Sequence, residues 1–137
     1  MPVDIPAPVL ERLASEQLIW LTTAKADGMP LPNPVWFLWR DGGFLVLSIP
    51  GSVKMKNLER NPRLSLHFNS SREDGSDVAI FQCEGHVDNA PASGAEIKDY
   101  VAKYEAGLQY LGITEEALVE QYRPVRIDVL RYRTVTG

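Results

Sequence analysis

The chain has 137 residues, an apolar fraction of 45% and a formal net charge of −4 at pH 7. This length fits one domain with one buried core, and we take residues 1–137 as that domain. The acidic balance argues against a general nucleic-acid or anionic-membrane binder, which needs a basic surplus. The single cysteine excludes an intrachain disulfide, and no apolar run approaches the ~20 residues of a membrane helix. Because the N-terminus also lacks the pattern of a secretory signal, we predict a cytoplasmic protein.

The first half of the chain reads as strands separated by tight turns. Asp27-Gly28 and Asp41-Gly42 are pairs typical of hairpin turns. The apolar periodicity predicts an amphipathic helix over 9–17 and strands over 18–24, 31–40 and 44–49.

The second predicted strand differs from the others because both of its faces are large and apolar. The run Val35-Trp36-Phe37-Leu38-Trp39 contains no alternating polar residue. A strand with one wet face would alternate, so the second face needs a cover. A late helix is one candidate cover. We favour a second subunit, and therefore predict a homodimer.

The second half of the chain begins with a helix and ends with a strand. Asn61-Pro62 ends the predicted helix, since a residue before proline avoids the helical region. After a helix over 52–60, we predict strands over 63–69, 78–88 and 125–134, a helix over 91–105 and a short helix capped by Thr114. About six strands in hairpin order predict a mainly β protein built on an antiparallel barrel with flanking helices.

Two lysines at the start of the helix over 52–60 indicate an anion site. Ser52 is a natural N-cap, and Lys54 and Lys56 follow it within the first turn and a half. The N-terminal end of a helix is already partly positive, so cations there are unfavourable unless an anion lies nearby. A phosphate held by the Ser52 hydroxyl, the free backbone N–H groups and a lysine would resolve the conflict. The alternative is a solvated lysine pair on an amphipathic helix that buries Met55 and Leu58.

Other reactive residue types form no recognisable site. One cysteine and two histidines are too few and too scattered for a zinc site. Cys83 lacks the context of a nucleophile and is predicted to be a small core residue. The acidic residues of the loop over 70–77 are predicted to be solvated. Tyr100, Tyr104 and Tyr110 are predicted to pack the late helices.

An ordered set of short motifs over about residues 18–88 is similar to the pyridoxamine-phosphate-oxidase-like superfamily. It most resembles the branch of probable enzymes dependent on the deazaflavin coenzyme F420. The motifs are Leu21-Thr22-Thr23, Asp27-Gly28-x-Pro30, Pro34-Val35-Trp36-Phe37, Ser52-x-Lys54-x-x-Asn57-Leu58, Asn61-Pro62 and Leu64-x-Leu66-x-Phe68.

The resemblance implies a six-stranded antiparallel split β-barrel of the type that binds flavin mononucleotide (FMN). It also implies a homodimer with two cofactor sites at its interface. By position, Ser52, Lys54 and Asn57 would hold the cofactor phosphate, with Lys56 close by. The ring would be lined by Pro34, Val35 and Trp36 of the second strand and by Ser48 of the third.

The second strand departs from pyridoxamine phosphate oxidases proper, which carry an arginine early in it. Here that stretch reads Leu31-Pro32-Asn33-Pro34, so vitamin B6 oxidation is disfavoured. We expect an oxidoreductase that uses F420 to transfer a hydride to a small organic acceptor. Such chemistry needs no catalytic side chain of the protein. The alternatives are an FMN-dependent oxidoreductase of the same class and a non-catalytic carrier of flavin, F420 or haem.

Overall fold

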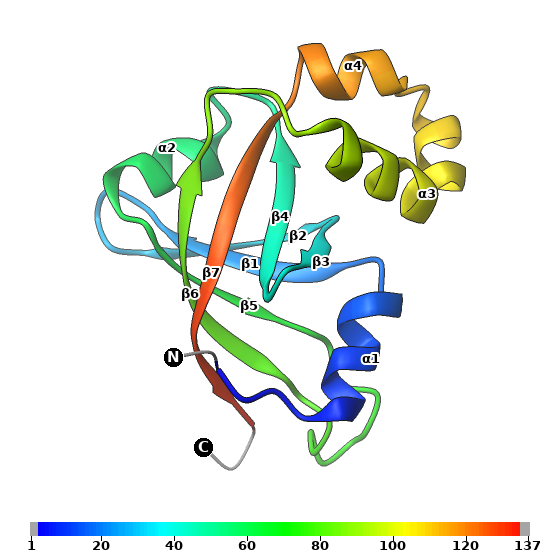
Figure 1. Cartoon of the computed structure of the whole chain (residues 1–137). Helices are drawn as coiled ribbons and strands as arrows, with labels where there is room; N and C mark the ends of the chain where they lie inside the picture. The colour runs from blue at the N-terminus through cyan, green and yellow to red at the C-terminus, as the bar shows by residue number, and fades with distance from the viewer. Residues whose placement is uncertain (1–2, 135–137) are drawn as a thin grey trace.

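The computed structural model describes residues 3–134, in which strands dominate and helices lie around one curled sheet (Figure 1). In chain order the elements are α1 (Ala7–Ser15), β1 (Ile19–Ala24), β2 (Pro30–Val35), β3 (Leu38–Arg40), β4 (Gly43–Ser48), α2 (Val53–Arg60), β5 (Arg63–His67), β6 (Ile80–Val87), α3 (Gly94–Leu111), α4 (Glu115–Glu120) and β7 (Arg123–Arg133). No helix within residues 3–134 is long and apolar enough to cross a membrane.

The described strands form one antiparallel sheet in the order β2-β1-β5-β6-β7-β4-β3. The sheet curls into a half-barrel, with α2 near one end of it and α3 and α4 beside β4 (Figure 1). This arrangement confirms the predicted antiparallel split barrel. The described chain has seven strands where the sequence predicts about six, because the predicted strand over 31–40 is divided in two.

The division of that strand falls at Trp36 and Phe37. Before it, β2 pairs with β1; after it, β3 pairs with β4 at the other edge of the sheet. Phe37 therefore has no strand partner, and α3 supplies one. The Phe37 backbone N–H donates to Tyr104 Oη at 2.9 Å, and Lys103 Nζ donates to the Phe37 carbonyl at 3.0 Å. A contact across 67 residues thus overrides the uniform strand propensity of the segment.

Two hydrophobic clusters lie on opposite faces of the sheet. The inner cluster fills the half-barrel with side chains such as Phe37, Phe44 and Phe81. The outer cluster packs Leu38, Leu45 and Leu47 against α3 and α4. Helix α3 is therefore the cover that the 35–39 segment requires, and our prediction that a second subunit supplies it is wrong. The homodimer itself remains a proposal.

The edge strand β2 carries a proline at every second position. Pro30, Pro32 and Pro34 lie opposite Ala24, Thr22 and Trp20 of β1. Because proline has no backbone N–H, the ladder to β1 must use the intervening residues of β2. The backbone carbonyl groups of the three prolines consequently point away from β1, toward the open edge of the sheet.

A network of charges ties α3 to β7. Glu96 closes the capping box of α3 with Ser93, and its side chain is only 11% exposed. Its carboxylate accepts from the Arg126 guanidinium at 2.6 and 3.1 Å, and Arg126 also donates to Asp88 at 3.0 Å. The bonds from Arg126 lower the pKa of Glu96 to about 2. Arg40 Nη1 lies 3.8 Å from the same carboxylate, so each of these charges has a partner.

Candidate functional site

Ser52 and Lys54 of the predicted phosphate site meet Ser48, which is predicted to line the ring, at the start of α2. Ser52 is the N-cap, as predicted, and its Oγ accepts from the Met55 backbone N–H at 3.4 Å. Ser48, at the end of β4, places its Oγ 3.1 Å from Ser52 Oγ. Lys54 Nζ donates to Ser48 Oγ at 3.4 Å. Two hydroxyls and one ammonium group therefore form a hydrogen-bonded cluster beside the free N–H groups of the helix.

The cluster is electrostatically one-sided. Helix α2 has no acidic residue in its first turn. Among residues 3–134, no carboxylate forms an ion pair with Lys54. The lysine is half-buried, and this burial lowers its pKa below the usual 10.5. An anion at this point would stabilise both the ammonium group and the positive end of the helix.

Lys56 and Asn57, also predicted for this site, lie in different environments. Lys56 is exposed on the outside of α2. This exposure agrees with the alternative given above, in which the lysine is solvated. Asn57 is buried: its Nδ2 donates to Thr23 Oγ1 at 3.0 Å and its Oδ1 accepts from Arg60 at 2.8 Å. Asn57 thus joins α2 to β1, and a contact of either residue with phosphate stays a prediction.

Three of the four predicted ring-side residues gather in a separate, apolar pocket of about 250 Å³ between β2, β4, α3 and α4, whereas the fourth, Ser48, lies in the cluster with Ser52 and Lys54. Pro34, Val35 and Trp36 all line the pocket. The Trp36 ring stacks on Tyr104, with ring centres 4.5 Å apart and planes 6° apart. A side chain at Gly107 would come within 2.7 Å of the Trp36 ring, so glycine there allows the helix to lie against the indole.

The tyrosines of α3 show what the sequence could and could not reveal about this pocket. Tyr100 and Tyr104 are buried against Trp36, which confirms their predicted packing role. Tyr110 is 90% exposed, so the same prediction is wrong for it. Helical spacing places Tyr100 and Tyr104 on one face. No pattern in the neighbouring sequence predicts that this face of the helix contacts Trp36.

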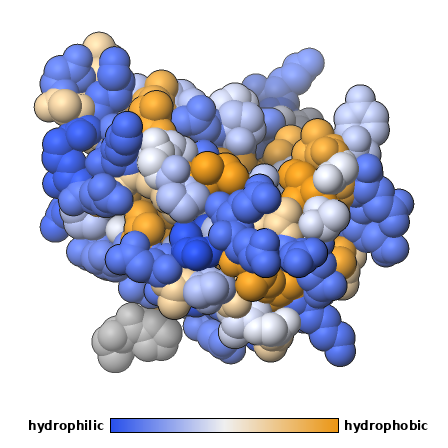
Figure 2. All heavy atoms as spheres, turned by 90° about the horizontal axis from the view of Figure 1, so that it is seen from above, coloured by the Kyte–Doolittle hydropathy of each residue, from blue (hydrophilic) through white to orange (hydrophobic). Residues whose placement is uncertain are grey.

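The phosphate cluster and the ring-side pocket remain apart in one chain. None of the five main pockets within residues 3–134 is lined by both sets of residues. Leu47 lines the apolar pocket, and Ser48, the next residue of β4, belongs to the cluster. Successive strand side chains point to opposite faces. The two parts therefore lie on opposite sides of β4. Seen from above, the surface of the protein carries several hydrophobic patches with hydrophilic residues between them (Figure 2).

The remaining reactive candidates have structural roles. Cys83 is buried, which confirms its predicted place in the core, and burial raises the pKa of its thiol to about 12. Asp77 is bound by the hydroxyls of Ser70 and Ser71 within its own loop. His67 stacks on Trp20, with ring centres 6.4 Å apart. None of these three residues has the contacts expected of a nucleophile or of a member of an acid–base pair.

The sequence model of the pyridoxamine 5'-phosphate oxidase family matches residues 5–135. The chain therefore belongs to the pyridoxamine 5'-phosphate oxidase family. Among curated proteins the sequence has no match.

Three similar solved structures share the fold. A protein described as an F420 reductase is 18% identical with a TM-score of 0.70, covering 94% of this chain and 98% of its own. An FAD-binding protein from Mesorhizobium loti is 16% identical with a TM-score of 0.70, covering 93% and 90%. The haem storage protein HutZ from Vibrio cholerae is 15% identical with a TM-score of 0.66, covering 93% of both chains. At these identities the likeness establishes the split-barrel fold alone.

Proposed function

We propose that the protein is an oxidoreductase that uses the deazaflavin coenzyme F420 to transfer a hydride to a small organic acceptor. One observation carries the proposal: half-buried Lys54 meets Ser48 and Ser52 at a helix N-terminus without a carboxylate partner in residues 3–134. The chain belongs to the pyridoxamine 5'-phosphate oxidase family, and it shares its fold with proteins described as an F420 reductase and as FAD-binding.

The donors at the start of α2 fit a phosphate. The two hydroxyls, the Lys54 ammonium group and the unpaired backbone N–H groups are all able to donate to oxygen atoms. Bonds from a charged donor are stronger than neutral ones, and the helix end adds to the attraction. In this proposal Lys54 and the serines hold the cofactor phosphate.

The charge of the cluster favours the deazaflavin over FMN. The phosphodiester of F420 carries one negative charge, which the single lysine of the cluster matches. FMN ends in a dianion, and β2 offers no arginine as a second clamp. Beyond the cluster, Lys56 and Arg63 are exposed and spread along the surface, an arrangement that suits the carboxylates of the F420 tail through long-range attraction. Arg60 contributes less because Asn57 and the Ala24 carbonyl hold it.

The chain's own residues bind and orient, while the cofactor supplies the hydride chemistry when bound. Pro34 and Trp36 offer an apolar surface for a ring, and α3 fixes the Trp36 indole. Because the ring-side pocket and the phosphate cluster are separated within one chain, we further propose a homodimer in which each cofactor contacts both copies.

Competitive titration of the purified protein tests the proposal. F420 and FMN are added at two salt concentrations, and fluorescence reports binding. We expect tighter binding of F420, and a larger loss of its affinity when salt rises. Tighter binding of FMN would instead make the protein an FMN-dependent oxidoreductase. Binding of F420 or haem without turnover of the reduced cofactor, across a panel of acceptors, would make it a carrier.

A further inference from the structure

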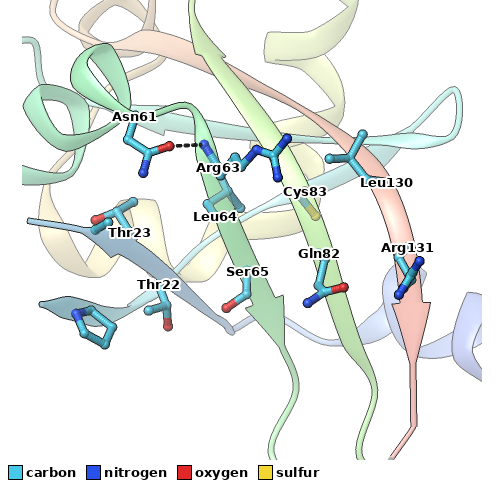
Figure 3. Close-up of a pocket in the computed structure, with 12 residues that line it drawn as sticks. Thr22, Thr23, Asn61, Arg63, Leu64, Ser65, Gln82, Cys83, Leu130 and Arg131 are labelled. Carbon is cyan, nitrogen blue, oxygen red and sulfur yellow. Dashed lines mark hydrogen bonds between the residues drawn. The ribbon is translucent and has the colours of Figure 1, made fainter. Parts of the chain in front are cut away.

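A groove of about 540 Å³ crosses the outer face of the sheet over β1, β5, β6 and β7, away from the start of α2. Figure 3 shows its lining residues as sticks. It adjoins the opposite end of α2, where Asn61 follows the last helical residue. The groove shares no lining residue with the Ser48, Ser52 and Lys54 cluster. Arg63 is the one lining residue that the proposed function also uses, for long-range attraction of the F420 tail.

The floor of the groove is a row of polar side chains placed by strand register. Thr22 pairs with Ser65, Ser65 with Gln82, and Gln82 with Arg131. Residues opposite one another in neighbouring strands point to the same face. The hydroxyl and amide groups of Thr22, Ser65 and Gln82 have no hydrogen-bond partner among residues 3–134, so they are available to a ligand.

The charge of the groove is positive, although the protein is acidic. Its lining includes Arg63 and Arg131 and no aspartate or glutamate. Neither arginine forms an ion pair with any residue in 3–134. Glu84 lies opposite Arg63 in register, but the basic group close to its carboxylate is His86 Nε2, at 3.9 Å. The Arg63 side chain extends from β5 across β6, while Arg131 enters from β7 (Figure 3).

A bulge adds an apolar wall between the two cations. Gln82 pairs with Arg131 but Cys83 pairs with Val129, so Leu130 has no partner in β6. Its side chain is 51% exposed and lines the groove. Strand spacing puts the Arg63 and Arg131 backbones roughly 12 Å apart, since they lie two strands and two residues from each other.

We propose that this groove is a second ligand site, which takes a small aliphatic dicarboxylate. Each carboxylate binds one guanidinium, and the methylene chain lies on Leu130. The polar row of Thr22, Ser65 and Gln82 donates further hydrogen bonds to the carboxylate oxygens. The two positive ends and the apolar middle of the groove thus match the two negative ends and the apolar middle of the ligand.

Calorimetric titration of the whole protein tests this site without any cofactor. Glutarate and adipate are the probes, butyrate is the monocarboxylate control, and sodium chloride keeps the ionic strength equal. We expect both dicarboxylates to bind and butyrate to bind at least tenfold more weakly. Arg63→Gln and Arg131→Gln should each lower dicarboxylate affinity about tenfold, because each removes a charge-assisted bond. Arg72→Gln, in the exposed 70–77 loop, is the matched control and should change nothing.

Several results would overturn the proposal. One is equal binding of butyrate and glutarate, and another is an equal loss in the Arg72 and Arg131 variants. A third is the absence of dicarboxylate binding to the wild-type protein, combined with a change from dimer to monomer when Arg63 and Arg131 are both replaced. That result would show that the groove is a contact between subunits. Because no step uses F420, failure here leaves the proposed function intact, and failure to bind F420 leaves this site intact.

Discussion

Two charged clusters in this protein have opposite designs. Around Glu96, each charge is paired: Arg126 bridges Glu96 and Asp88, and Arg40 lies close by. Around Lys54, two hydroxyls and a helix end surround one cation that has no carboxylate partner in residues 3–134. Paired charges of low exposure hold elements together, whereas an unpaired half-buried cation lowers stability until a ligand arrives. The difference separates a cluster that holds elements together from one that we propose to bind an anion, without reference to any relative.

The largest effect should come from breaking the paired cluster. Glu96→Gln removes the charge that Arg126 contacts at 2.6 Å. Removing one member of a buried pair costs about 3–5 kcal/mol, and partial exposure of Arg126 reduces this, so we expect a loss of about 2–3 kcal/mol in the free energy of unfolding. Urea denaturation measures it. Asp99→Asn, at a carboxylate that is 53% exposed, is the control and should cost less than 0.5 kcal/mol.

The same variant makes a prediction about pH. The pKa of Glu96 is about 2 in the folded chain against an ordinary 4.5. Its stabilisation is therefore complete above pH 4.5 and is lost as pH falls toward 2. Wild type should lose more stability than Glu96→Gln over this interval. Parallel acid-unfolding curves for the two proteins would contradict the structural role assigned to Glu96.

The next effect should come from the unpaired cluster. Lys54→Ala should weaken F420 binding tenfold or more, about 1.5 kcal/mol, because it removes a charge-assisted bond to the phosphate. Fluorescence titration measures the affinity, and Lys56→Ala, which removes an exposed lysine of the same helix, should have a smaller effect. An unchanged affinity for F420, together with a less stable apoprotein, would show that the role of Lys54 is purely structural.

The smallest effect has the opposite sign from the first. Lys54→Met should stabilise the protein without cofactor by a few tenths of a kcal/mol, since it removes a cation that opposes the helix dipole. Burial lowers the Lys54 pKa below 10.5, so wild type regains stability as pH rises toward 10.5 and the lysine loses its proton. The advantage of the variant should shrink over that range. Thermal melts at pH 7 and pH 10 measure it, and destabilisation at pH 7 would contradict the comparison.

Local sequence signals were sufficient for the fold class and for the cap of α2. The Asp-Gly turns, the alternation in β5 and the Ser52 cap each depend on neighbours in the chain, and the structure has all of them. The divided strand was not predictable, because the residue that satisfies the Phe37 backbone is Tyr104. The same holds for Arg126, whose partner Glu96 lies 30 residues away.

The candidate site was predictable only in part, for a similar reason. Helix-capping chemistry identifies Ser52, and charge at a helix end identifies Lys54. That Asn57 turns inward to Thr23 depends on how α2 packs on β1, and Gly107 matters only because Trp36 lies against it. Both facts require the tertiary arrangement.

The prolines of β2 limit how copies of this chain can associate. Their backbone faces the open edge of the sheet, so that edge presents carbonyl acceptors but no N–H donors at Pro30, Pro32 and Pro34. An incoming strand from another molecule would find half of its hydrogen bonds missing, and strand addition or fibril growth from this side is blocked. A dimer of this chain therefore does not continue the sheet through β2, which leaves the faces of the barrel, where cofactor-sized molecules can be enclosed, and the β3 edge for the contact between copies.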